Sequence, residues 1–221
     1  MISLNQVINA DCMDIMKDIP DKYFELAIVD PPYGIGEDGG KGVRVSKARP
    51  NSYLMRPKYD TNKKWDKQPP NKNYFQELKR VSQNQIIFGA NHFIESIPFN
   101  SSCWIVWDKQ NGGSDFADCE LAWTSFKSAV RQFTGHKFTG LSAGKDCIHP
   151  TQKPVALYKW LLKNYAKAGD KILDTHAGSC SSVVACIDYG FEYLAIEKDK
   201  DYYEASLKRI DKELQKIKMF P

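Results

Sequence analysis

The sequence predicts an α/β protein with a mostly parallel sheet and helices on both faces. Two observations support this prediction. Short apolar runs bounded by turn residues, which are typical of buried strands, alternate with amphipathic stretches of helical period. In addition, Asp30, Asp174 and Glu197 each follow an apolar run directly. Ligands of such sheets bind beyond the carboxyl ends of the strands, so these positions indicate the functional edge.

The predicted strands are short and rich in aliphatic and aromatic residues. They lie at 25–29, 85–88, 103–107, 119–123, 171–173 and 193–196.

Helices are predicted at 74–81, 154–168 and 179–189, and along the final stretch of the chain. The second has Pro154 in its first turn and Gly169 as its stop signal, and Leu157, Trp160, Leu161 and Tyr165 share one face. In the final helix a one-sided stripe is formed by Tyr203, Leu207, Ile210, Leu214 and Ile217.

The composition indicates one domain over residues 1–221, because 42% hydrophobic residues suffice for a normal core. No apolar run is long enough to cross a bilayer, and the first residues lack the pattern of a signal peptide. We therefore expect a soluble, cytoplasmic protein. The six cysteines and four histidines are widely spaced, which predicts reduced thiols and no metal site.

Positive charge is concentrated between Gly34 and Lys72. This segment has ten basic and four acidic residues, a net charge of +6, whereas the whole chain carries +4. Five of its first nine residues are glycine, and apolar periodicity is absent. We expect a flexible basic insertion at about 34–72 that meets a polyanion, with a solvated loop lacking any partner as the alternative.

The motif Asp30-Pro31-Pro32-Tyr33 follows the strand predicted at 25–29. Its two prolines stiffen an extended turn, which fixes Asp30 and Tyr33 at the edge of the sheet. A carboxylate and a backbone carbonyl there could accept both N–H bonds of an exocyclic amino group, and an aromatic ring could stack on the base. The alternative is an ordinary Pro-Pro turn.

Two further motifs lie near the other end of the chain. A strand leads into Asp174, a turn containing Gly178 and the start of a helix, and Glu197 follows the next strand. This arrangement is typical of a nucleoside cofactor site, with the acidic residue on the ribose hydroxyls. The segment His149-Pro150-Thr151-Gln152-Lys153-Pro154 precedes the amphipathic helix.

Together these motifs resemble the amino-methylating DNA methyltransferases, and their order resembles the beta class, in which the catalytic motif precedes the cofactor motif. The resemblance covers nearly the whole chain. It implies a Rossmann-like methyltransferase sheet, mostly parallel with an antiparallel strand, and S-adenosylmethionine as cofactor. It also implies double-stranded DNA as partner and methylation of the N6 amino group of adenine, often within a restriction-modification system.

The resemblance also implies roles for single residues. The catalytic residues would be Asp30, Pro31, Pro32 and Tyr33, and Tyr33 would stack on a flipped base. Cofactor-binding residues would be Asp11, Asp30, Thr151, Lys153, Asp174, Ala177, Gly178, Ser179 and Glu197, with Thr151 and Lys153 near the amino-acid end of the cofactor. His149 is expected to be structural.

The cofactor loop departs from the family pattern Asp-Pro-Phe-x-Gly-Ser-Gly. Thr175 and His176 replace Pro and Phe, and Cys180 replaces the second Gly. We expect that a side chain at position 180 crowds the turn. We also expect that the protein binds the cofactor more weakly than a protein with the family pattern would.

DNA phosphates are expected to meet basic residues of two segments. These are Lys47, Arg49, Arg56, Lys58, Lys63 and Lys64 in the insertion, and Arg131 and Lys137 in a target-recognition stretch at about 124–148, for which a solvated loop is the alternative. So small a recognition apparatus predicts a short target site or a homodimer.

Three other functions remain open. The first is methylation of cytosine N4, although the leading Asp30 favours adenine because that branch more often has Ser. The second is methylation of RNA or of a protein side-chain amide. The third is a DNA-binding protein that has lost catalysis through its altered cofactor loop. No cysteine follows a proline as a covalent cytosine-C5 mechanism requires.

Overall fold

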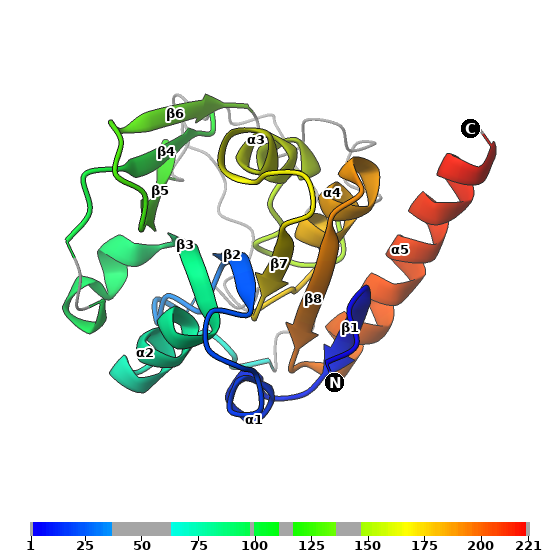
Figure 1. The fold of residues 1–221 in the computed structure, drawn as a ribbon, viewed down its shortest axis with the longest axis horizontal. Coiled ribbons are helices and arrows are strands. Elements are labelled where there is room, and N and C mark those ends of the chain that lie inside the picture. Colours follow the sequence, from blue (N-terminus) through cyan, green and yellow to red (C-terminus); the bar gives the residue numbers. More distant parts are fainter. Residues whose placement is uncertain (1, 37–62, 98–99, 111–116, 136–146, 220–221) are drawn as a thin grey trace, which may run out of the picture.

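The computed structural model describes residues 2–36, 63–97, 100–110, 117–135 and 147–219, with side chains described to residue 215. Within these ranges the strands are β1 (Gln6–Asn9), β2 (Phe24–Val29), β3 (Ser82–Phe88), β4 (Trp104–Asp108), β5 (Cys119–Thr124), β6 (Arg131–Thr134), β7 (Lys171–Asp174) and β8 (Glu192–Glu197). They form one sheet in the spatial order β1-β8-β7-β2-β3-β5-β4-β6 (Figure 1).

Strand direction confirms the predicted sheet. Neighbours from β1 to β3 pair in parallel, and so do β4 and β6. The antiparallel strand is β5, which lies between β3 and β4. The start of β5 therefore lies at the same edge as the carboxyl ends of β3 and β4.

The helices are α1 (Cys12–Met16), α2 (Lys72–Val81), α3 (Val155–Tyr165), α4 (Ser181–Tyr189) and α5 (Lys200–Met219), with short 3-10 turns η1 (Ala90–His92) and η2 (Ile94–Ser96). Alternate residues of β2 show how they cover the sheet. Leu26 and Ile28 pack in a cluster with α3 and α4, whereas Ala27 and Val29 pack in a cluster with α1 and α2. Helices therefore cover both faces, as predicted (Figure 1).

The predicted elements lie where the sequence places them, with shifted ends. β3 starts three residues earlier than predicted, and α3 is shorter, because Pro154 is its N-cap and Ala166 its C-cap. The stretch Arg131–Thr134, for which a loop was considered, is instead strand β6, whose register pairs it with β4 from Ile105 to Asp108.

The apolar stripe predicted on the last helix is wrong in part. The buried positions are Tyr202, Ser206 and Ile210, whereas Leu214 is exposed. Leu214 lies in the second half of α5, which extends beyond the sheet (Figure 1). Ile217 lies outside the described side chains.

Among the described residues, none of the helices combines the length and the apolar character that a membrane span requires.

Candidate active site

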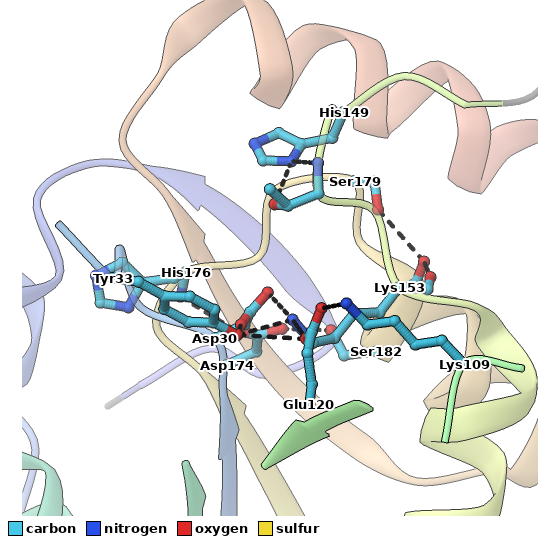
Figure 2. A network of polar contacts seen from close by, with 12 residues as sticks. Asp30, Tyr33, Lys109, Glu120, His149, Lys153, Asp174, His176, Ser179 and Ser182 are labelled. Atoms are coloured by element: carbon cyan, nitrogen blue, oxygen red, sulfur yellow. Dashed lines mark hydrogen bonds and ion pairs between the residues drawn. The ribbon is translucent and has the colours of Figure 1, made fainter. Parts of the chain in front are cut away.

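Parallel pairing brings the two main motifs together. β2 pairs with β7 through Leu26–Ile172 and Ala27–Leu173, so Asp30 and Asp174 emerge at the same edge of neighbouring strands. β8 pairs with β7 on its other side and places Glu197 at that edge. Figure 2 shows Asp30 and Asp174 close together, as the sequence predicts.

The first motif is held by Tyr33. Its hydroxyl donates to Oδ1 of Asp30 at 2.7 Å, and its ring stacks on the His92 imidazole with centroids 5.1 Å apart. Gly89, with φ +67°, passes so close to the ring that an ideal Cβ would lie 2.0 Å from Cε1 of Tyr33. The glycine is therefore needed for the position of the tyrosine.

A network of charges surrounds Asp30 (Figure 2). Nζ of Lys153 lies 2.5 Å from Oδ2 of Asp30 and 3.0 Å from Oε2 of Glu120, and Nζ of Lys109 lies 2.5 Å from Oε1 of Glu120. Burial raises the pKa of Asp30, and the Lys153 ammonium opposes that shift. Burial would also raise the pKa of Glu120, but the two lysines lower it to about 2. Glu120 is therefore ionised at neutral pH.

Lys153 lies between the two motifs. Its carbonyl accepts a hydrogen bond from the Ser181 hydroxyl at 2.7 Å, so its backbone adjoins the cofactor loop. Its ammonium, however, binds Asp30 and Glu120, because a buried cation is stable only beside carboxylates. The side chain of Lys153 therefore lies with the Asp30 motif.

The second motif forms a tight turn between β7 and α4. Asp174 accepts hydrogen bonds from the Ser182 hydroxyl and from the His176 N–H, and burial raises its pKa to about 7. Glu197 accepts from the Gly178 N–H at 2.7 Å and from the Asp199 N–H at 2.7 Å, so it holds the turn together.

The three departures from the family pattern have structural accounts. The Thr175 hydroxyl bonds with the Tyr74 hydroxyl at 2.6 Å, and the His176 ring packs edge-on against Tyr74. Burial lowers the pKa of His176 to about 4, so it is a neutral aromatic ring at neutral pH. Cys180 keeps the left-handed backbone suited to glycine, φ +57°, and its side chain is buried in the core cluster that contains α3 and α4.

His149 and Thr151 lie beside this turn. The Thr151 hydroxyl and the His149 Nδ1 are 3.1 Å apart, and the His149 ring packs against Trp65 and Tyr202. A Cβ on Gly178 would meet the His149 ring at 3.6 Å. Ala177 and Ser179 are buried in the same turn, where the Ala177 N–H donates to the Ile196 carbonyl.

Asp11 serves first as a helix cap. Its carboxylate accepts from the Met13 N–H at 2.9 Å and pairs with Lys198 at 2.8 Å, contacts that lower its pKa. It lies beside β1, whose Asn9 pairs with Glu197, so it is near the cofactor motif.

The predicted DNA contacts are described only in part. Lys63 pairs with Asp199 and with Asp201, so its charge is neutralised within the protein rather than presented to phosphates. Lys64 and Arg131 are exposed. Outside the described residues lie Lys47, Arg49, Arg56, Lys58 and Lys137.

Sequence reasoning missed Glu120, Lys109 and Gly89. A usable signal existed for Glu120, which is an acidic residue inside the otherwise apolar run at 119–123. Gly89 directly follows a predicted strand, as functional glycines often do, whereas Lys109 carries no distinguishing pattern. In the described part of the chain, no group of three or more His, Cys, Asp or Glu side chains is placed to hold a metal ion.

Comparison with known proteins gives consistent matches. A family model described as DNA methylase, for N6 and N4 methyltransferases, matches residues 51–208. The type II methyltransferase M.HinfI of Haemophilus influenzae is 23% identical over 94% of this chain and 68% of its own length. DNA adenine methyltransferase YhdJ of Escherichia coli is 36% identical over 32% of this chain and 26% of its own.

A solved structure shares the fold. The M1.HpyAVI-SAM complex superposes with a TM-score of 0.58 at 19% identity, covering 92% of this chain and 98% of that one.

We expect Gly89→Ala to destabilise the protein more than the matched change Gly190→Ala. Both glycines have positive φ, +67° and +73°, so each alanine costs roughly 1–2 kcal/mol in backbone strain. Only the Cβ at position 89 collides with Tyr33, which should add about 1–3 kcal/mol. Urea unfolding measures both variants, and equal losses would contradict the role given to Gly89.

Proposed function

The chain belongs to the DNA methylase family, and on that premise we propose that it transfers a methyl group from S-adenosylmethionine to the N6 amino group of adenine in DNA. The neighbouring positions of Asp30 and Asp174 support this proposal most directly. They bring an amine-binding motif and a nucleoside-binding motif to one edge of the sheet.

The chemistry requires a carboxylate at the amino group. The lone pair of an exocyclic amine is delocalised into the base, so the nitrogen is a weak nucleophile. Asp30 and a carbonyl stiffened by Pro31 and Pro32 would accept its two N–H bonds and stabilise the positive charge that develops on nitrogen. Burial strengthens this interaction, since the Asp30 side chain is only 16% exposed.

The residues of the second motif fit the cofactor. Gly178 has no side chain and a positive φ of +49°, so a ligand can approach its backbone closely. Glu197 is buried and has lone pairs left for the ribose hydroxyls, and Asp174 is suited to the amino-acid ammonium. Thr151 adjoins the same turn through His149.

When bound, S-adenosylmethionine supplies an electrophilic methyl group on a sulfonium. The residues of this chain would bind and orient. Asp30 would hold the amine, and Tyr33, whose ring stacks on His92 in this structure, would stack on the flipped base. Exposed Lys64 and Arg131 are the described candidates for phosphate contacts.

Cytosine N4 is the second candidate target, because the family model covers both kinds of methylation. Asp30 favours adenine, as does the local similarity to a protein named DNA adenine methyltransferase. The aromatic replacement at His176 and the buried side chain of Cys180 support an active enzyme rather than a protein without catalysis.

We expect the protein to convert adenine in plasmid DNA to N6-methyladenine, and Asp30→Ala to lower the rate by about 100-fold or more. Binding of S-adenosylmethionine should stay measurable, because Asp174 and Glu197 would still hold the cofactor. Mass spectrometry of digested DNA identifies the base, and calorimetry measures cofactor binding.

Asp188→Ala is the matched control for that variant. Asp188 also pairs with a lysine, at 2.6 Å, and is 24% exposed, but it lies on α4 away from the edge. A near-normal rate for Asp30→Ala would refute the role of Asp30. If the product is N4-methylcytosine, the target base is cytosine and not adenine.

Affinity for S-adenosylmethionine should rise between about pH 6 and about pH 7.5. The pKa of Asp174 is raised to about 7, so the carboxyl is neutral below that pH and becomes an anion above it. Only the anion attracts the cofactor ammonium, which stays protonated until about pH 7.7–8.0. Calorimetry of Asp174→Asn should show weaker binding and no rise in affinity over this pH range. An equal rise in the variant would mean that a group other than Asp174 causes the pH dependence.

A further inference from the structure

Four buried or half-buried charges alternate in sign beside the proposed amine site. In order they are Asp30, Lys153, Glu120 and Lys109, with contacts of 2.5, 3.0 and 2.5 Å. They come from the end of β2, the segment before α3, the start of β5 and the residue after β4. Their charges sum to zero, and removing any one of the four would leave a buried charge without its full set of partners.

The Lys153 ammonium lies where it can donate hydrogen bonds to the carboxylate that the target amino group would use. Its ammonium has three N–H bonds, and it lies within hydrogen-bond distance of Oδ2 of Asp30, Oε2 of Glu120 and the Tyr33 hydroxyl at 3.2 Å. The side chain is 3% exposed, so water does not compete for these acceptors. Oδ1 of Asp30 is already engaged by Tyr33.

This arrangement conflicts with the methyl transfer proposed above. A target amino group needs a lone pair of Asp30, and Lys153 and Tyr33 already occupy one on Oδ2 and one on Oδ1. The lysine also carries a positive charge, which opposes the positive charge that develops on the target nitrogen. The transition state is therefore more stable once the ammonium has withdrawn from Asp30.

Glu120 is an alternative counter-ion for the Lys153 ammonium. A buried cation without a counter-ion is strongly unfavourable, but Nζ of Lys153 is already 3.0 Å from Glu120. Lys109 binds the other oxygen of Glu120 and fixes the carboxylate. A small rotation of the lysine side chain can thus exchange one partner for the other.

We propose that Glu120 is a positioning residue, which takes the Lys153 ammonium from Asp30 when the target amino group arrives. Lys153 stands in for that amine in the free protein and keeps Asp30 oriented. This inference rests on the proposed function. The competing role for Glu120 is that of a counter-ion that only stabilises the fold.

Glu120→Gln tests the two roles. The substitution keeps the shape but leaves the ammonium with Asp30 as its one carboxylate partner in this network, so the single-turnover rate on plasmid DNA should fall about tenfold or more. Glu25→Gln is the matched control, because Glu25 also lies on a strand, is 28% exposed against 22% for Glu120, and pairs with Lys171. Its rate should stay within about twofold of that of the unmodified protein.

The double variant Glu120→Gln with Lys153→Met separates the roles further. It restores a neutral site and removes the competing ammonium, so the rate should recover about fivefold or more over Glu120→Gln alone. Thermal unfolding and cofactor affinity, measured on every variant, correct each rate for the folded and cofactor-bound fraction.

Two results would overturn the inference: an unchanged corrected rate for Glu120→Gln, or a double variant no faster than the single one. Either leaves the proposed function standing if the unmodified protein methylates DNA. An unmodified protein that methylates no DNA would instead overturn the proposed function, and this inference with it.

Discussion

The parallel pairing of β2 with β7 is the constraint on which the site depends. From β2 the chain crosses to β3 on one side, whereas from β7 it crosses to β8 on the other. At such a reversal the loops beyond the two strands diverge and leave room for a ligand. Asp30 and Asp174 lie at this point, so a shift in register between these strands would separate the amine motif from the cofactor motif.

The antiparallel strand β5 adds what the parallel part cannot supply. Because β5 runs opposite to β3 and β4, its first residues lie at the functional edge, and Glu120 faces the charges there. Lys153 reaches the same point from the segment before α3. The carboxylate of Asp30 is thus paired with Lys153, which Glu120 also binds. Such a buried network is costly unless every member is paired.

The cofactor loop shows how a changed sequence can keep a required geometry. Cys180 holds a left-handed backbone without being glycine, which is unfavourable, and its buried side chain compensates through packing. His176 is uncharged at neutral pH because it is buried, and it packs against Tyr74 as an aromatic ring. The altered residues therefore keep the turn that Glu197 holds through the Gly178 N–H.

Much of this arrangement could be predicted from the sequence, because strand period and the residues after each strand depend on local pattern. Asp30, Asp174 and Glu197 were placed correctly at one edge for that reason. The partners of Lys153 and Lys63 could not be predicted, since ion pairs depend on which distant segments meet in space. Strand β6 was missed because its four residues, one of them apolar, show no alternation strong enough to predict an edge strand.

A crystal structure of the protein with S-adenosylmethionine would test the central claim most directly. We expect the ribose at Glu197, the amino-acid end at Asp174, and the sulfonium methyl directed toward the carboxylate of Asp30. A cofactor bound away from residues 174–179, or one whose methyl group points away from Asp30, would contradict the account.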